Sequence, residues 1–145
     1  MSTSYWAIEG LGLEADRSLF DYQKLLFFIK ANFDLPNEDF EDVDEESFED
    51  FLYSTNIYYE DLLEAIVEDF NNNHIGYMNG GNADTGNFIL FFTNYPWQFK
   101  EQDLKITEEE ARELVYECIR PYLKDELSKE DIMERIYHIS TYGCG

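Results

Sequence analysis

The spacing of apolar residues changes along the chain between the two-residue period of strands and the three- to four-residue period of helices. Near the N-terminus, Tyr5 to Leu13 is predicted to be a strand, with Trp6 and Ile8 on one face. Gly10 and Gly12 lie within this strand. They indicate a bulge or the close approach of another backbone.

Helical spacing dominates the next part of the chain. A helix is predicted from Ser18 to Phe33, and Leu35-Pro36 ends it. A loop over residues 36–47 and a short helix at about 46–54 follow. The clearest helix runs from Tyr59 to Phe70, because its apolar residues form one continuous stripe. These residues are Leu62, Leu63, Ile66, Val67 and Phe70.

The second half of the chain predicts a hairpin, two helices and a closing strand. The hairpin strands are Ile75 to Met78 and Asn87 to Thr93, joined by a connection rich in Asn and Gly. Both helices open with Ser or Thr followed three residues later by an acid. The first runs from Thr107 to about Tyr122 and the second begins at Ser128. Tyr137 to Tyr142 is predicted to be the last strand.

These elements predict an α+β fold, in which a small antiparallel sheet of about four strands packs against four to five helices on one side. Residues 1–145 are expected to form a single compact domain, because no internal repeat or long linker divides them. The length and a hydrophobic content of 44% suit one well-filled core. The segment 34–50, an acidic loop with a short helix, lies within this domain.

Acidic residues are both abundant and clustered. The chain has 32 Asp and Glu against 10 Lys and Arg, a formal net charge of -22. Between Lys30 and Lys100 there is no Lys or Arg, while 16 acids fall there, ten of them from Asp34 to Asp50. Like charges this close repel and lower stability. A fold that needed only solubility would intersperse lysines among them.

The clustered carboxylates are the candidate partner-binding residues. Glu60, Glu64 and Glu68 are spaced by one helical turn and form a regular row. Sixteen charges at the spacing of duplex DNA would span about 27 Å, or about eight base pairs. The candidate contacts are Asp34, Glu38, Asp39, Glu41, Asp42, Asp44, Glu45, Glu46, Glu49, Asp50, Glu60, Asp61, Glu64, Glu68 and Asp69.

The same charge balance argues against direct binding to nucleic acids or anionic membranes, which need a basic surface. No apolar run has the length of a membrane span, and no signal peptide is visible. Cys118 is expected to be buried in a helix, and Cys144 lies next to the C-terminus. This cysteine usage favours a reducing compartment, so a cytoplasmic location is expected.

The sequence predicts no enzyme activity, metal site or cofactor. Neither His74 nor His138 has a nucleophile at a useful spacing, and a pair of His138 with Cys144 is only a weak alternative. A stretch starting at Asp42 begins like a calcium loop. It has Ser47 where the loop needs glycine, and Tyr53 where it needs glutamate. A weak site at Asn79, Asn82 and Asp84 is the remaining metal alternative.

Aromatic residues that flank the acidic stretches are candidate anchors for a partner, because Tyr and Trp are favoured at the centres of interfaces. The alternative is that most of them belong to the core. The candidates are Tyr53, Tyr58, Tyr59, Tyr77, Tyr95 and Trp97.

In its short length, acid excess, aromatic content and the block without Lys or Arg from Ala31 to Phe99, the chain resembles small phage and mobile-element proteins that inhibit bacterial defence nucleases. Among these are DNA-mimicking anti-restriction proteins and acidic anti-CRISPR proteins. The resemblance implies an inhibitor that occupies a basic groove, such as the one that reads the short duplex motif beside a CRISPR target. These inhibitors share no common fold, so it assigns no residue a role.

Two other functions fit the same charge pattern. One is an immunity protein that neutralises a basic nuclease toxin, since steered association of opposite charges serves both roles. The other is an acidic soluble protein whose carboxylates are simply solvated and have no nucleic-acid-related partner. The target nuclease, the origin of the protein and its oligomeric state are not encoded in any recognisable motif.

Overall fold

The computed structural model describes residues 5–79, 86–94 and 106–144. Four strands in these ranges form one antiparallel sheet with the order β2-β3-β1-β4. They are β1 (Tyr5–Glu14), β2 (Ile75–Asn79), β3 (Asn87–Asn94) and β4 (Tyr137–Cys144). The predicted α+β fold with a small antiparallel sheet is therefore confirmed.

Five α-helices and three short 3-10 helices accompany the sheet in the same ranges. The α-helices are α1 (Tyr22–Asn32), α2 (Phe48–Ser54), α3 (Tyr59–Phe70), α4 (Glu108–Ile119) and α5 (Lys129–Met133). The 3-10 helices are η1 (Arg17–Leu19), η2 (Asn37–Phe40) and η4 (Arg120–Tyr122).

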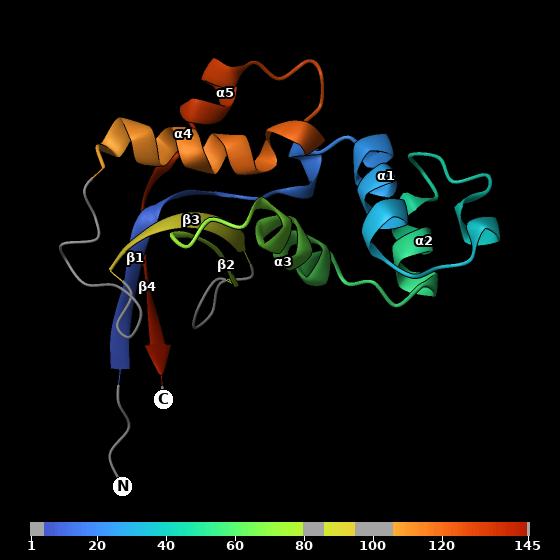
Figure 1. The fold of residues 1–145 in the computed structure, drawn as a ribbon, viewed down its shortest axis with the longest axis horizontal. Helices are drawn as coiled ribbons and strands as arrows, with labels where there is room; N and C mark the ends of the chain where they lie inside the picture. Colours follow the sequence, from blue (N-terminus) through green and yellow to red (C-terminus); the bar gives the residue numbers. More distant parts are fainter. Residues whose placement is uncertain (1–4, 80–85, 95–105, 145) are drawn as a thin grey trace, which may run out of the picture.

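The elements are arranged along one long axis (Figure 1). The sheet, α4 and α5 form one end of the molecule, whereas α1 and α2 form the other. Helix α3 lies between the two ends. One main cluster of buried side chains connects them, because it includes Leu13 of β1, Leu25 of α1, Phe48 of α2 and Val115 of α4. The acidic segment 34–50 is thus held at the end far from the sheet.

The two faces of the sheet differ. Leu11 and Ile89 point into the main core, whereas Leu90 packs with Ile139 in a second, smaller cluster on the other face, as the alternation of side chains along strands requires. The register between β1 and β3 shifts at Gly10, which confirms the predicted irregularity there.

Gly12 is predicted to tolerate no side chain. A Cβ atom on Gly12 would lie 2.2 Å from the carbonyl oxygen of Ile89 and 2.9 Å from the Cα of Leu90. Both are backbone atoms of the paired strand β3, so they cannot move aside without breaking the ladder. We expect Gly12→Ala to lower the free energy of unfolding by about 3 kcal/mol. Urea denaturation measures this, and a loss below about 1 kcal/mol would contradict the close approach of the strands.

The predicted helix from Ser18 to Phe33 is wrong at its N-terminal end. The Asp16 side chain accepts a hydrogen bond from the Ser18 backbone N–H, which starts η1. The chain then extends through Phe20. The Asp21 side chain accepts hydrogen bonds from the backbone N–H groups of Gln23 and Lys24. It thereby caps α1, which begins only at Tyr22. Asp prefers such N-cap positions to a helix interior, and two of them divide the predicted helix.

The other helices agree more closely with the sequence. Helix α3 has the predicted ends, and Asn71 stops it in the left-handed conformation with φ of 55°. Thr107 caps α4 and Ser128 caps α5, as predicted. The loop expected over residues 36–47 contains the short helix η2. The acidic segment is therefore more ordered than its charge suggests.

Candidate functional site

The acidic segment, defined as residues 34–50, turns its carboxylates outward because its apolar residues are anchored. Phe40 packs on Phe51 with ring centroids 5.5 Å apart, and Phe48 stacks on Phe51 at 6.1 Å. Val43 is half-buried against the main core. All ten acids of the segment are exposed. With Leu35, which also packs against the main core, four apolar anchors in 17 residues thus hold a dense group of carboxylates at the surface.

A local turn shapes the middle of this segment. The Asp44 side chain accepts from the Ser47 backbone N–H at 2.8 Å, and the Ser47 hydroxyl accepts from the Asp44 N–H at 2.9 Å. The hydrogen bonds from Ser47 hold the pKa of the Asp44 carboxyl below its usual value. Asp44 therefore stays ionised in mild acid, and the turn leads directly into α2 at Phe48.

Helix α3 carries the second group of candidate contacts. Glu60, Asp61, Glu64 and Glu68 are all exposed and lie opposite the buried stripe of Leu62, Leu63 and Ile66. We call these four residues the α3 acidic face. Burial raises the pKa of Tyr77 on β2 to about 12, and Glu60, Glu64 and Asp61 contribute to the shift. The charges of Glu60, Asp61 and Glu64 thus act on Tyr77 of β2.

Asp69 lies apart from the α3 acidic face. Burial raises the pKa of Tyr122 in η4 to about 12, and the Asp69 carboxylate adds to that shift. Asp69 is therefore on the flank of α3 that approaches η4. Of the fifteen predicted contacts, all are exposed, but they belong to three places: the acidic segment, the α3 acidic face and this flank.

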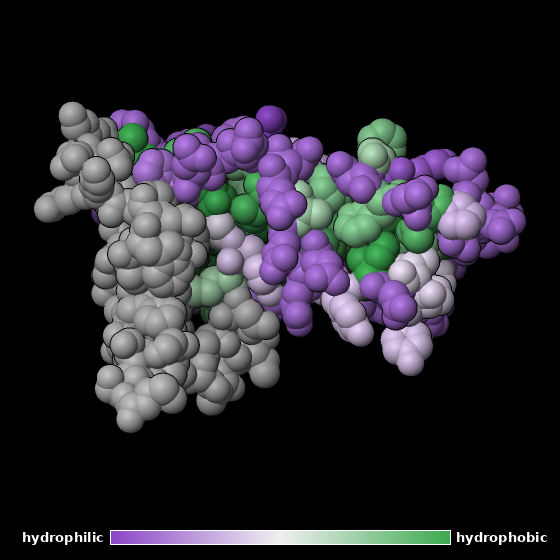
Figure 2. All heavy atoms as spheres, turned by 60° about the horizontal axis from the view of Figure 1, so that its bottom comes forward, coloured by the Kyte–Doolittle hydropathy of each residue, from purple (hydrophilic) through white to green (hydrophobic). Residues whose placement is uncertain are grey.

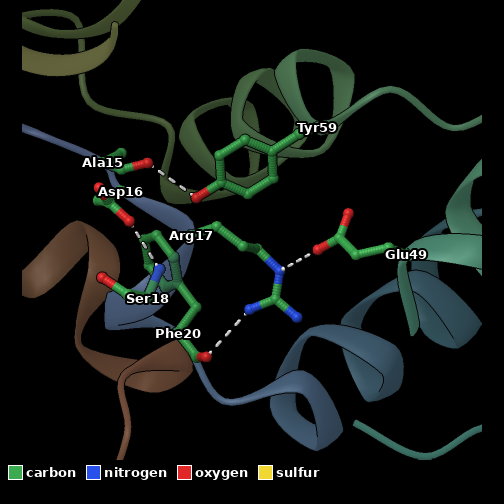
Figure 3. A network of polar contacts seen from close by, with 7 residues as sticks. All are labelled: Ala15, Asp16, Arg17, Ser18, Phe20, Glu49 and Tyr59. Carbon is green, nitrogen blue, oxygen red and sulfur yellow. Dashed lines mark hydrogen bonds and ion pairs between the residues drawn. The ribbon is translucent and has the colours of Figure 1, made fainter. Parts of the chain in front are cut away.

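Two cations from the N-terminal part of the chain reach the acidic segment. Arg17 Nε donates to Glu49 Oε1 at 3.1 Å, and the same guanidinium donates to the Phe20 carbonyl at 3.2 Å (Figure 3). It also lies over the Phe48 ring, 4.6 Å from its centroid. Lys30 Nζ lies 5.8 Å from the centroid of the Phe40 ring. Among the described residues, only Arg17 forms an ion pair with any of the fifteen carboxylates.

The Arg17 network also fixes α2 and α3 against the end of the sheet. Figure 3 shows Tyr59 of α3 pointing to the Ala15 carbonyl, to which its hydroxyl donates at 2.8 Å. Glu49 of α2 meets Arg17 from the other side. The sequence gives no sign of this contact, since 32 residues separate the two partners. Arg17 holds α2 in place and leaves most of the negative charge uncompensated.

The hydrophilic surface is not one uninterrupted strip. Figure 2 keeps the long axis of Figure 1 and shows hydrophilic side chains gathered at the α2 end and over the middle of the molecule. Apolar side chains lie between these two areas on this face. The two larger groups of candidate carboxylates, the acidic segment and the α3 acidic face, are called the two acidic areas below; Asp69 lies apart from both.

The aromatic candidates divide into two kinds. Tyr53 is 89% exposed and Tyr58 is 67% exposed, so both are available to a partner. Tyr59 is largely buried in the network described above, and the Tyr77 hydroxyl donates to Asn87 Oδ1. The hydroxyls of these two half-buried tyrosines are thus bonded within the protein. Tyr95 and Trp97 lie outside the described residues.

The residues considered for catalysis are far apart or already engaged. His74 stacks on Phe91 with ring centroids 5.2 Å apart. His138 and Cys144 are six residues apart on β4, about 20 Å along a strand, which rules out the weak alternative of their pairing. Burial raises the pKa of the Cys118 thiol to about 12, so this buried thiol is neutral at physiological pH.

A hollow of about 370 Å³ brings His138 beside Glu108 and Thr107. Glu108 pairs with Arg112 at 2.9 Å, and the Thr107 hydroxyl accepts from the Glu110 N–H at the start of α4. These contacts stabilise the first turn of α4. Glu108 and Thr107 in the hollow thus stabilise the start of α4. Neither of these two contacts pairs a base with a nucleophile.

No cluster of three potential metal-ligating side chains occurs within residues 5–79, 86–94 and 106–144. In the calcium-like stretch, Asp44 is engaged with Ser47, and Tyr53 is part of α2. Asn82 and Asp84 of the other metal alternative lie outside these ranges. In the same part of the chain, no helix is long and apolar enough to cross a membrane.

Salt is expected to stabilise the fold. The ten exposed acids of the segment repel one another, and added ions screen charges that are more than about 10 Å apart at 0.1 M. We expect the melting temperature to rise by about 5 °C between 20 and 300 mM NaCl, and calorimetry measures it. An unchanged melting temperature would show that the acids are too dispersed to repel.

Comparisons of the chain with protein-family models, curated proteins and solved structures found no match. The two acidic areas and their surroundings are therefore the features that bear on function.

Proposed function

We propose that this protein inhibits a nucleic-acid-binding bacterial defence nuclease, of the anti-CRISPR or anti-restriction type, in the host cytoplasm. Its carboxylates take the place of DNA phosphates and occupy the basic groove in which the nuclease binds DNA. The observation that carries this proposal is the exposure of all fifteen candidate carboxylates, of which only Glu49 forms an ion pair among the described residues.

Electrostatics explains why such a surface would bind a basic groove. A cleft lined with Lys and Arg attracts an anionic partner and raises the rate of association, most strongly at low salt. Release of counterions from both surfaces adds to the affinity. Tyr53 and Tyr58 offer aromatic contacts beside the acids. The self-repulsion of the acidic segment is relieved in the complex, so binding also stabilises the fold.

The proposal is tested by capturing partners from a bacterial lysate on the immobilised protein, with and without added duplex DNA. A mimic is expected to retain a nuclease when DNA is absent and to lose it when duplex is in excess, because both compete for one groove. Retention of the same nuclease at undiminished yield in the presence of duplex would contradict mimicry. Capture of a nuclease toxin that is encoded beside the inhibitor gene would favour an immunity protein instead.

A further inference from the structure

Two exposed tyrosines mark the connection between α2 and α3 (Figure 1). Tyr53 lies near the end of α2, and Tyr58 lies directly before the first residue of α3. We call residues 53–58 the α2–α3 corner. Within the part of the chain that the structure describes, neither tyrosine hydroxyl forms a hydrogen bond and neither ring contacts another ring. Large aromatic side chains without such an internal role are typical of surfaces that bind another protein.

The backbone of the α2–α3 corner is fixed by hydrogen bonds. Asn56 has a φ of 60°, the left-handed conformation that commonly ends a helix. Its N–H donates to the Tyr53 carbonyl at 3.2 Å, and the Ile57 N–H donates to the Leu52 carbonyl at 2.9 Å. Leu52 and Ile57 are both buried. Each exposed tyrosine directly follows one member of this bonded pair, so the Cα atoms of the two tyrosines lie within about 15 Å of each other.

The acids beside the two tyrosines are placed by the same helices. Asp50 lies one turn before Tyr53 on the exposed side of α2. Asp61 follows Tyr58 by three residues, the spacing at which an N-cap residue and the first helical turn face each other. Both carboxylates are exposed, and neither forms an ion pair with a described residue. Each exposed ring therefore has an uncompensated carboxylate as its neighbour.

The cations that reach this end of the molecule are engaged elsewhere. The Arg17 guanidinium pairs with Glu49 at 3.1 Å and lies over the buried Phe48 ring. Lys30 lies over the ring of Phe40 in η2. The local charge at the α2–α3 corner is thus negative, and it favours a cationic side chain of a partner.

We propose that the α2–α3 corner binds arginine side chains of the partner, each guanidinium stacking on a tyrosine ring and pairing with the adjacent carboxylate. A guanidinium is planar, so it can stack on an aromatic face while its N–H groups donate to a carboxylate. The ammonium group of lysine is a compact, strongly hydrated charge that matches this arrangement less well. This inference rests on the proposed function for the identity of the partner, the basic nuclease, and specifies arginine as its contact residue.

Two labelled peptides of about nine residues test the corner without the nuclease, one with arginines and the other with lysines at the same positions between glycines. In about 150 mM salt, we expect the wild-type protein to bind the arginine peptide about fivefold more tightly than the lysine peptide. The NMR signals of the Tyr53 and Tyr58 ring protons should shift on addition of the arginine peptide. Those of Phe27, an exposed ring that lies with Lys24 on α1, should not.

Matched variants assign the preference to the two rings. Tyr53→Leu combined with Tyr58→Leu keeps apolar side chains but removes the aromatic faces, and should reduce the preference for arginine to less than about twofold. Tyr53→Phe combined with Tyr58→Phe keeps the faces and should retain the preference. Phe27→Leu removes an exposed ring at another surface and should also retain it. Circular dichroism checks that each variant is folded.

Three results would overturn the inference: equal affinities of the two peptides for the wild-type protein, a preference for arginine that survives in the double leucine variant, or NMR shifts centred on another surface. The test separates this inference from the proposed function. If the preference depends on the two tyrosines but no nuclease is captured, only the proposed function fails. If a nuclease is captured and displaced by duplex but the preference is absent, only the role of the corner fails.

Discussion

A variant with four lysines in the acidic segment is expected to inhibit the target nuclease at least about 100-fold less well, while keeping the wild-type fold. The four substitutions are Glu38→Lys, Asp39→Lys, Glu41→Lys and Asp42→Lys. All four side chains are exposed, so the substitutions remove no buried contact. They place positive charge against a basic groove, and the loss of close interfacial charge pairs costs several kcal/mol. The inhibitor concentration for half-maximal DNA cleavage measures the effect.

A control variant separates the position of the charges from their number. Its four lysines replace exposed acids at the other end of the molecule: Glu109, Glu126, Glu130 and Glu134. This variant has the same net charge and is expected to inhibit within about threefold of the wild type. If the first variant inhibited the nuclease as strongly as the wild-type protein, the acidic segment would not be the contact. Equal losses in both variants would show that only net charge matters.

One position of the first variant needs its own check. Asp42 has a φ of 60°, a left-handed conformation that Asp tolerates better than Lys. A triple variant that keeps Asp42 avoids this strain and should still lose most of the inhibition. Loss of activity in the quadruple variant alone, together with a lower melting temperature, would point to misfolding instead of lost contacts.

The affinity for the target nuclease is expected to fall at least about 100-fold between 50 and 300 mM salt. Each carboxylate that replaces a phosphate competes with small ions for the groove, so the logarithm of the affinity should fall linearly with the logarithm of salt concentration. Calorimetric titrations at several salt concentrations measure this slope. The four-lysine variant should have a smaller slope, and a flat response of the wild-type complex would indicate an apolar interface.

The elements that the sequence predicted well are those whose determinants are local. The ends of α3 follow from its strong apolar stripe and from Asn71, which adopts the left-handed conformation after the last turn. The start of α1 was wrong because two Asp caps outweighed the apolar spacing from Ser18 onward. The sheet order β2-β3-β1-β4 depends on pairing between distant segments, which no local pattern encodes.

The candidate surface was predictable in its exposure but not in its layout. Acids rarely lie in a core, so the outward position of all fifteen followed from residue type. The contact of Arg17 with Glu49 and the apolar area between the hydrophilic areas of Figure 2 depend on tertiary packing. The same holds for Phe27, which is exposed because η4, more than 90 residues later in the chain, packs beside Phe28 instead.

Displacement of fluorescently labelled duplex DNA from the purified, captured nuclease is the decisive test of phosphate mimicry. If the carboxylates of this protein take the place of phosphates, increasing inhibitor should release all of the duplex, and the inhibitor concentration required should rise in proportion to the duplex present. A ternary complex in which nuclease, duplex and inhibitor remain bound together would show that the carboxylates do not occupy the DNA-binding groove.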